Sequence, residues 1–364
     1  MPRIVVALPR GLSFGPARAT SIDLCARDFV SFSRHRAQTV IVGEAIENPF
    51  PDMPFQGVPR SSLTPHWLYA ARLARHIKSL RPDLVVVHQH IPSAVRIAKA
   101  LRGVPVLLHR HNGHKARRGA FARQRDLNAY GSFARILWVS AFNRDAFAAA
   151  YPELAPRAVV IHNGIDFTAW RPESVRCEEV FFAARLMPQK GCLEAAQACA
   201  QALADQPHWR ARFMLAREKD DADYLAAVQQ ALAPLGPRAE IAFNQTHDAV
   251  RAAYCSAAIA LVPSVYAEPF GRTAIEAFAG GAALICSMRG GLGEIARGFA
   301  EEAAPEAPAI AEGITRLVND PEYRADLARR GRARGEAHFD IRAVTAKLDD
   351  TYDSVLAEHA RSAA

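Results

Sequence analysis

Two glutamates flank a Phe-Gly pair in the stretch "EPFGRTAIEAFAGG", with Glu268 before the pair and Glu276 in the segment after it. The small and apolar residues after Gly271 predict a helix whose first backbone amides have no partner inside the helix. Such amides, together with the helix dipole, favour an anion. Carboxylates accept hydrogen bonds from vicinal hydroxyls, so carboxylates beside an anion site suit a ligand with both hydroxyls and phosphate. The stretch therefore predicts a binding site for a nucleotide-sugar.

The elements that must hold this site are predicted from short apolar runs that alternate with longer helical stretches. Runs that are apolar throughout are typical of parallel strands buried on both faces of a sheet. The first series reads "RIVVAL", "TVIVG", "DLVVVH", "VPVLLH" and "RILWVS", and the second reads "EEVFFAARL", "RARFMLA", "AEIAFN", "AIALVPS" and "AALICS". This alternation predicts an α/β fold with doubly wound sheets.

Two domains of similar size are expected, because the polar stretch "DFTAWRPESVRCEE" separates the two series. We predict a first domain over residues 1–170 and a second over residues 171–340. Ligands of open α/β sheets bind at the carboxyl ends of the strands. The cleft between the two domains is therefore the expected site.

The glutamate stretch resembles the signature of the family-4 retaining glycosyltransferases, in which an E-x-F-G turn is followed by a second Glu. Here the pattern reads Glu268, Phe270, Gly271 and Glu276, and Gly280-Gly281 end the helix. The resemblance implies the GT-B fold, in which two Rossmann-like domains face a cleft. It further implies that the last helix, within residues 341–364, crosses back to the first domain. Glu268 would contact the donor sugar, and Glu276 the nucleotide ribose.

Other segments resemble the family in the same order. "FFAARLMPQKG" supplies Arg185 and Lys190, which would neutralise the donor diphosphate, and "PVLLHRHNG" supplies His111, which would sit beside the donor sugar. Gly15 fits one position of the glycine pair that follows the first strand in the family, although Pro16 departs from the pattern and Gly11 is the alternative. The implied catalytic residues are His111, Glu268, Arg185 and Lys190. The implied donor-binding residues are Gly15, Arg185, Lys190, Glu268, Phe270, Gly271, Arg272, Thr273 and Glu276.

The family implies transfer with retention of anomeric configuration, of a hexose such as mannose. No carboxylate can be assigned as a nucleophile, so we expect a front-face route in which the departing diphosphate takes the acceptor proton. Asp221-Ala222-Asp223 has the form of the metal-binding D-x-D of the other glycosyltransferase fold. It opens a predicted helix here, where acidic residues favour the N-terminus. We therefore expect no metal and no other cofactor.

The acceptor is expected to bind the first domain, where a basic stretch, "HKARRGAFARQR", covers residues 114–125. It could lie on an anionic membrane, grip a phosphorylated glycolipid, or be a solvated loop. We predict a glycan or glycolipid of the cell envelope, with lipopolysaccharide or polysaccharide as the product. Nucleic acid is not an expected partner, because no recognised motif accompanies the net charge of +8.

Location in the cell is predicted from the cysteines and from hydropathy. The six cysteines are scattered without any C-x-x-C, which is typical of free thiols in a reducing compartment. No run of about eighteen apolar residues is present, so no membrane span is expected. We predict a cytoplasmic protein that can sit at the inner face of the cytoplasmic membrane.

Two other functions fit part of the sequence. A non-catalytic GT-B protein could bind a nucleotide-sugar without transferring it. A metal hydrolase could use histidines that fall at or after two strand ends, although no matching acidic or cysteine ligands are found. These histidines are His88, His90, His109, His111 and His114. We expect His88, His90 and His114 to be polar residues that line the cleft.

Overall fold

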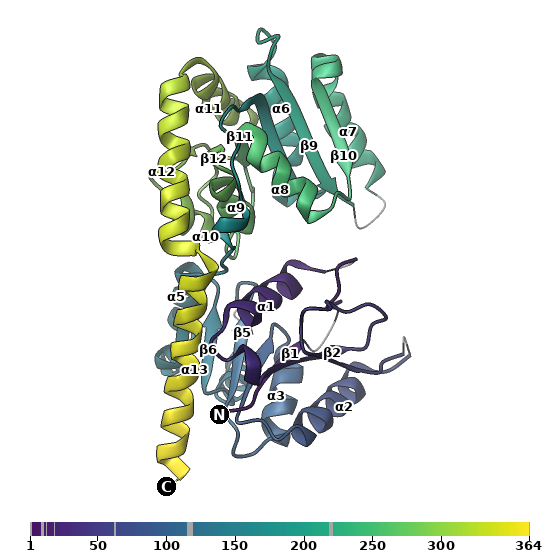
Figure 1. The fold of residues 1–364 in the computed structure, drawn as a ribbon, viewed down its shortest axis with the longest axis vertical. Coiled ribbons are helices and arrows are strands. Elements are labelled where there is room, and N and C mark those ends of the chain that lie inside the picture. Colours follow the sequence, from purple (N-terminus) through teal and green to yellow (C-terminus); the bar gives the residue numbers. More distant parts are fainter. Residues whose placement is uncertain are drawn as a thin grey trace. The chain divides into compact units, whose positions relative to one another are not determined.

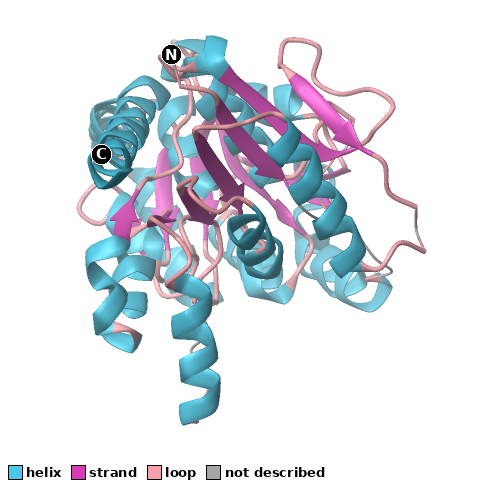
Figure 2. Ribbon diagram, turned by 90° about the horizontal axis from the view of Figure 1, so that it is seen from below, coloured by secondary structure: helices cyan, strands magenta, loops and turns pink. Residues whose placement is uncertain are grey.

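The computed structural model describes residues 2–8, 11, 13–17, 19–61, 63–114, 119–217 and 221–363. The chain forms two compact units, unit 1 with residues Met1–Gly164 and Ile341–Ala364, and unit 2 with residues Ile165–Asp340. Each unit has one parallel sheet between layers of helices (Figures 1 and 2). The predicted fold of two doubly wound α/β sheets is confirmed.

Unit 1 contains a seven-stranded sheet in the order β3-β2-β1-β4-β5-β6-β7, and all its neighbouring strands are parallel. The strands are β1 Ile4–Leu8, β2 Thr39–Glu44, β3 Phe55–Val58, β4 Leu84–His88, β5 Val106–Arg110, β6 Arg135–Trp138 and β7 Ala158–Val160. The helices of this unit are α1 Ser21–Phe32, α2 His66–Ser79, α3 Ile91–Ala100, α4 Ala120–Tyr130, α5 Ala141–Ala150 and α13 Ile341–Ala363.

Helices cover both faces of the unit 1 sheet. One face packs against α2, α3, α4 and α5, and the other packs against α1 and α13. Alternate residues of a strand point to opposite faces, so Val85 and Val87 of β4 join the first core while Leu84 and Val86 join the second. The prediction that the C-terminal helix returns to the first domain is confirmed, since α13 belongs to unit 1.

Unit 2 contains a six-stranded sheet in the order β10-β9-β8-β11-β12-β13, again with parallel neighbours. The strands are β8 Cys177–Arg185, β9 Arg210–Ala216, β10 Ala239–Phe243, β11 Ala257–Val262, β12 Ala283–Cys286 and β13 Glu301–Glu302. The helices are α6 Cys192–Ala202, α7 Ala222–Leu232, α8 His247–Ser256, α9 Arg272–Gly280, α10 Gly291–Ala296, α11 Ala307–Asn319 and α12 Pro321–Phe339. Its main core lies between the sheet and α6, α7 and α11.

The strand order of each sheet reverses at one place. In unit 1 the chain builds outward from β1 to β2 and β3, and then returns to add β4 on the other side. In unit 2 the same reversal separates β8 from β11. Loops that leave two such strands diverge, which opens a crevice at the carboxyl ends of the strands, where ligands of this fold class bind. The residues that follow β1, β4, β8 and β11 are therefore the ones to inspect.

None of the helices in the described ranges combines the length and the apolar character needed to cross a lipid bilayer.

Candidate active site

A buried glutamate lies at the centre of the site in unit 2. Glu268 stands in the loop that leaves β11, with 5% of its surface exposed. Its Oε1 accepts hydrogen bonds from Lys190 Nζ at 2.6 Å and from Ser264 Oγ at 2.6 Å. Its Oε2 accepts one from the phenol of Tyr266 at 2.5 Å. A carboxylate this deeply buried requires such partners, because an unpaired buried charge is costly.

The sequence offers a signal for two of these partners that the prediction did not use. Ser264, Tyr266 and Glu268 recur at every second position of the loop that follows β11, and the hydroxyls of the first two meet the Glu268 carboxylate. Burial and the adjacent carboxylate of Glu268 raise the pKa of Tyr266, so the phenol stays protonated and can donate. The ammonium of Lys190 also lies 5.3 Å from the centroid of the Tyr266 ring, a cation–π distance.

The two predicted cationic residues follow β8, which is the neighbour of β11 in the sheet. Arg185 is the last residue of β8 and is exposed. Lys190 belongs to the short 3₁₀ helix Pro188–Lys190, which precedes α6. The sheet thus brings Lys190 and Glu268 together from opposite sides of the reversal in strand order, although they are 78 positions apart in the sequence.

The backbone of the Glu268 loop is held by the loop after β12. The amide of Glu268 donates to the Arg289 carbonyl at 3.2 Å, and the carbonyl of Glu268 accepts from the Gly291 amide at 2.7 Å. Gly290 sits between these contacts with a left-handed φ of 66°. A Cβ at Gly290 would lie 2.4 Å from the Glu268 carbonyl oxygen, so only glycine allows the two loops to approach this closely.

The second predicted glutamate, Glu276, lies in the second turn of α9 and is buried. Its Oε1 accepts a hydrogen bond from Arg272 Nε at 3.1 Å and lies 3.7 Å from Nε2 of His247, the first residue of α8. Burial alone would raise the pKa of Glu276, but the hydrogen bonds and positive charges of His247 and Arg272 outweigh it and lower the pKa below 4.5. The carboxylate is therefore ionised at neutral pH. His247 was not predicted from the sequence.

The start of α9 has the geometry expected of an anion site. Gly271 is the N-cap with φ 111°, and Arg272 and Thr273 open the first turn with half-buried side chains. The ring of Phe270 instead points into the core, where it is 3% exposed and meets the Phe339 ring edge to face at 5.8 Å. Phe270 therefore fixes the turn by packing.

The predicted residues of unit 1 are found at two places. His111 follows β5 and is 9% exposed, with its Nε2 2.9 Å from Nδ1 of His88, the last residue of β4. Gly15 is buried, and its amide donates to the Ser13 carbonyl at 2.7 Å. A Cβ at Gly15 would lie 2.3 Å from the Asn48 carbonyl oxygen, so the residue is small for packing reasons. The alternative, Gly11, is exposed with φ 63°.

Three histidines form a cluster in unit 1, where the sequence suggested five at a cleft. His88, His109 and His111 each offer a ring nitrogen within 4.8 Å of the others, and no carboxylate or thiolate joins them within the described ranges. The expectation that His88 lines a cleft is wrong, because it is 3% exposed. His114 packs edge to face against Tyr130, and its Nδ1 lies 3.1 Å from the Tyr130 hydroxyl. The ligand set that a metal hydrolase needs is thus not found among the described residues.

Two other predicted features include, or lie next to, residues outside the described ranges. In the basic stretch, residues 115–118 lie outside them, while Arg123 pairs with Glu153 at 2.8 Å and Phe121 is 85% exposed. Asp221 is the N-cap position of α7, and Asp223 lies in its first turn. This agrees with the reading of the D-x-D as a helix start, although residues 218–220 lie outside the described ranges.

Two family profiles match the chain. The family described as "Glycosyl transferases group 1" matches residues 171–334, and the one described as "Glycosyltransferase Family 4" matches residues 32–169. The first of these ranges contains the Lys190–Glu268 pair and Glu276, and the second contains the His88–His111 pair.

Individual known proteins agree with these profiles. The chain is 24% identical over 315 residues to a putative glycosyltransferase, YtcC, of Bacillus subtilis, which covers 79% of this chain and 76% of that protein. It is 29% identical over 297 residues to a glycogen synthase of Mycobacterium tuberculosis, which covers 76% and 69%. Among solved structures, Anabaena Alr3699/HepE in complex with UDP and glucose superposes with a TM-score of 0.80 at 18% identity, over 97% of this chain and all of that one.

Proposed function

We propose a specific reaction for this chain, which is a glycosyltransferase of the hexosyltransferase class with the GT-B fold. The chain moves a hexose from a nucleoside diphosphate sugar to a glycan or glycolipid of the cell envelope, with retention of anomeric configuration. The observation that carries this proposal is the Lys190–Glu268 pair, held at the reversal of strand order, with Glu276 and Arg272 on the adjoining helix. An isolated surface ion pair would not have this burial or these partners.

Each group of the unit 2 site suits one part of such a donor. The exposed guanidinium of Arg185, the ammonium of Lys190 and the amides at the start of α9 would hold the diphosphate. Glu268 would accept hydrogen bonds from hydroxyls of the hexose, and Glu276 from the ribose. The structures of Anabaena Alr3699/HepE with UDP and glucose support a nucleotide-sugar as the ligand class.

The proposed chemistry is a front-face displacement. The bond between C1 of the hexose and the diphosphate oxygen breaks, the acceptor oxygen bonds to C1 on the same face, and the acceptor proton passes to the departing diphosphate. Lys190 and Arg185 would stabilise the negative charge that develops on the leaving group. These cations take the place that a metal ion holds in other transferases, so we propose that the reaction proceeds without a metal.

Unit 1 supplies the remaining residues of the proposal. His111 would hydrogen bond to the hexose through its remaining ring nitrogen, Nδ1. Gly15 could offer its amide to the diphosphate only after the bond to the Ser13 carbonyl opens. The exposed Phe121 and the adjacent exposed Arg125 on α4 suit an anionic lipid surface, so we propose that the acceptor is reached at the inner face of the cytoplasmic membrane.

A donor panel tests the proposal. The chain is incubated with UDP-glucose, UDP-galactose and GDP-mannose, with EDTA present, and release of nucleoside diphosphate is followed. Glu268→Ala and Lys190→Ala are run beside the exposed controls Glu312→Ala and Lys99→Ala. Release from one donor, lost in the first two variants and kept in the controls, is the expected result. NMR of the product anomer then tests retention.

Calorimetry on the same panel separates catalysis from binding. Tight binding of one nucleotide without release, with envelope glycolipid extracts supplied as acceptor, would favour a non-catalytic binding protein. Failure of every nucleotide to bind would contradict the proposed site.

A further inference from the structure

Two histidines on the α1 and α13 face of the unit 1 sheet form a direct hydrogen-bonded pair. His88 Nδ1 lies 2.9 Å from His111 Nε2, and the two rings are stacked with an interplanar angle of 20°. His88 ends β4 and His111 follows β5, which are paired neighbours with His88 opposite His109. We infer that His88 is a positioning residue, which fixes the ring orientation and the tautomer of His111. This inference rests on the proposed function, in which His111 contacts the hexose.

Both rings of this pair are neutral, so the hydrogen bond between them determines the tautomer of His111. Burial lowers the pKa of His88 to about 3, and burial with the neighbouring His109, His88 and Arg110 lowers the pKa of His111 well below 6.5. A neutral imidazole carries one N–H and one bare nitrogen. Whichever way the bond between His88 and His111 runs, it sets whether Nδ1 of His111 is a donor or an acceptor. That nitrogen is the one left for a ligand.

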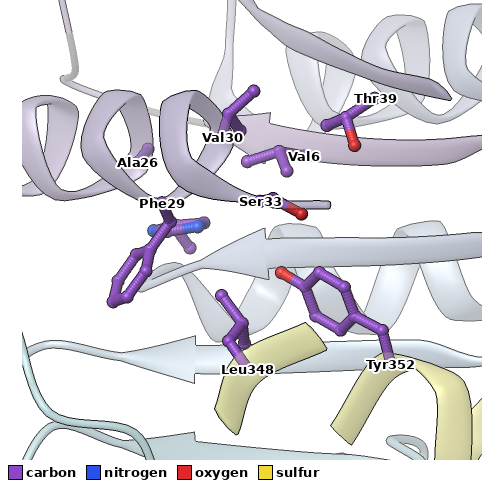
Figure 3. Close-up of a pocket in the computed structure, with 9 residues that line it drawn as sticks. Val6, Ala26, Phe29, Val30, Ser33, Thr39, Leu348 and Tyr352 are labelled. Atoms are coloured by element: carbon purple, nitrogen blue, oxygen red, sulfur yellow. The ribbon is translucent and has the colours of Figure 1, made fainter. Parts of the chain in front are cut away.

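His88 also lines a small cavity. The cavity has a volume of about 10 Å³ and is lined by His88, by apolar residues of β1, α1 and α13, and by three hydroxyl residues, Ser33, Thr39 and Tyr352 (Figure 3). A cavity of this size can hold about one water molecule when polar groups line it. Nδ1 of His88 is bonded to His111, so Nε2 is the atom that can bond to such a water.

The hydroxyls around the cavity are not equivalent. Ser33 Oγ donates to Oδ1 of the buried Asp349 at 2.6 Å, and Thr39 Oγ1 donates to the His35 carbonyl at 2.8 Å. Both have thus used their only hydrogen, whereas the hydroxyl of Tyr352 donates to no group in the part of the chain that the structure describes. A water molecule in the cavity would therefore link Tyr352 of α13 to His88, and His88 is bonded to His111. These residues all lie within unit 1.

A metal ion is the competing use of these imidazoles. Zinc–nitrogen bonds of about 2.0–2.1 Å in a tetrahedron place the ligand nitrogens about 3.4 Å apart. Here His88 Nδ1 and His111 Nε2 face each other at 2.9 Å, a hydrogen-bond distance that is shorter than this separation. Both ring nitrogens of His109 are buried without a partner among the described residues. The hydrogen bond between His88 and His111 accounts for the arrangement of two of the three rings. Metal binding is the alternative that the test below can detect.

The test uses two substitutions of nearly equal polarity. Asn places its amide where Nδ1 of His88 lies, facing His111, whereas Gln reaches toward the Nε2 position and the cavity. We expect His88→Asn to retain kcat/KM within about threefold and His88→Gln to lose about tenfold or more, because misplacement of a group that contacts the substrate by about 1 Å is costly. The loss in His88→Gln should fall mainly on kcat.

A spectroscopic measurement is independent of turnover. In chain labelled with ¹⁵N-histidine, the ring nitrogens of His111, assigned with His111→Asn, should report one neutral tautomer from about pH 8 to pH 5. His88→Asn should keep that pattern. In His88→Gln, the His111 ring should show a mixture of tautomers and should become protonated near pH 6, because it gains contact with solvent. His109 and Arg110 still face the His111 ring in this variant.

The results distinguish failure of the proposed function from failure of the positioning role of His88. If the wild-type chain transfers no sugar, yet the His111 tautomer depends on residue 88 as described, the proposed function fails and the positioning role stands. Equal spectra and equal kinetics in His88→Asn, His88→Gln and wild type would overturn the inference. So would a cobalt(II) absorption band of the wild-type chain that disappears in His109→Phe, because the rings would then serve a metal.

Discussion

Lys190 Nζ lies 2.6 Å from Glu268 Oε1, so a residue that follows β8 neutralises a residue that follows β11. The pair is complete before any ligand arrives. An ammonium has three N–H donors, and here one bonds to Glu268 while a second lies 3.4 Å from the Tyr266 hydroxyl. Among the described residues, one donor of Lys190 therefore remains for a phosphate oxygen, and its direction is already set by the other two contacts.

Breaking this pair should cost stability as well as activity. Lys190→Met leaves the Glu268 carboxylate buried without its cation, and removal of one partner of a buried pair costs about 3–5 kcal/mol. The double variant Lys190→Met with Glu268→Gln should recover about 1–3 kcal/mol of that loss, while donor turnover stays abolished. Urea unfolding of the two single variants, the double variant and the exposed control Lys99→Met measures the coupling. Strictly additive effects would show that the two residues do not interact.

Glu276→Gln should weaken donor binding without changing the chemical step. The carboxylate is proposed to hold the ribose equally in ground state and transition state, so KM should rise about tenfold while kcat changes by less than about threefold. Initial rates over a range of donor concentrations give both constants. A fall in kcat at unchanged KM would instead assign Glu276 to the reacting centre.

The same residue should make stability depend on pH below neutrality. The pKa of Glu276 is lower in the folded chain than its ordinary value of 4.5, so its contribution is present above about pH 4.5 and is lost as pH falls through the lower, folded pKa. Between about pH 5 and pH 3 the wild type should therefore lose more stability than Glu276→Gln. The exposed Glu312→Gln is the control, and unfolding curves of Glu276→Gln that run parallel to wild type would refute the assignment.

Gly290→Ala should displace the loop that carries Glu268. The new Cβ would meet the Glu268 carbonyl oxygen at 2.4 Å and would be held at a φ of 66°. Gly298→Ala is a matched control, since Gly298 has a φ of 78° and a Cβ there would meet no atom within 4 Å. Both variants should lose about 1 kcal/mol or more of stability to the left-handed backbone, but only Gly290→Ala should raise the donor KM. Thermal unfolding and KM measured together separate the two effects, and equal KM values would mean that the loop tolerates the methyl group.

The histidine cluster should make unit 1 less stable in mild acid. Burial lowers the pKa of His88, His109 and His111 in the folded chain, while each titrates near 6.5 when unfolded. As pH falls from about 7 to 5 the unfolded state takes up protons that the folded state does not, so stability falls by up to about 1.4 kcal/mol per pH unit for each ring. His109→Phe should give a shallower slope in urea unfolding at pH 7, 6 and 5. The exposed His208→Ala should leave the slope unchanged, and a wild-type slope near zero would contradict the burial of the cluster.

The strands were predictable because a strand buried on both faces leaves an uninterrupted apolar run. "DLVVVH" contains β4, whose five residues are all buried, and "AIALVPS" contains most of β11. The family signature also brought Glu268, Glu276 and Lys190 into one hypothesis. What the runs do not encode is the order in which strands pair, and the contact between Lys190 and Glu268 depends on that order.

The contact partners of Glu276, His88 and Phe270 could not be predicted from local sequence patterns. His247 meets Glu276 because α8 packs against α9, a contact between two helices with no shared motif. The cluster of His88 with His109 depends on the register of β4 against β5, in which a shift by one residue would move every side chain to the other face. The direction of the Phe270 ring was missed for a similar reason, since its partner Phe339 lies at the end of α12.

The return of α13 to unit 1 has a consequence for biosynthesis. Unit 2 is one continuous segment, Ile165–Asp340, whereas unit 1 needs its own first 164 residues and the segment Ile341–Ala364. Ile341, Val344, Leu348 and Tyr352 of α13 complete the core on the α1 side of the sheet. A nascent chain on the ribosome can therefore finish the unit that it begins second before the unit that it begins first. Until α13 emerges, that apolar face of the first-made half is covered by α1 but not by α13, and its uncovered part is exposed to chaperones and to aggregation.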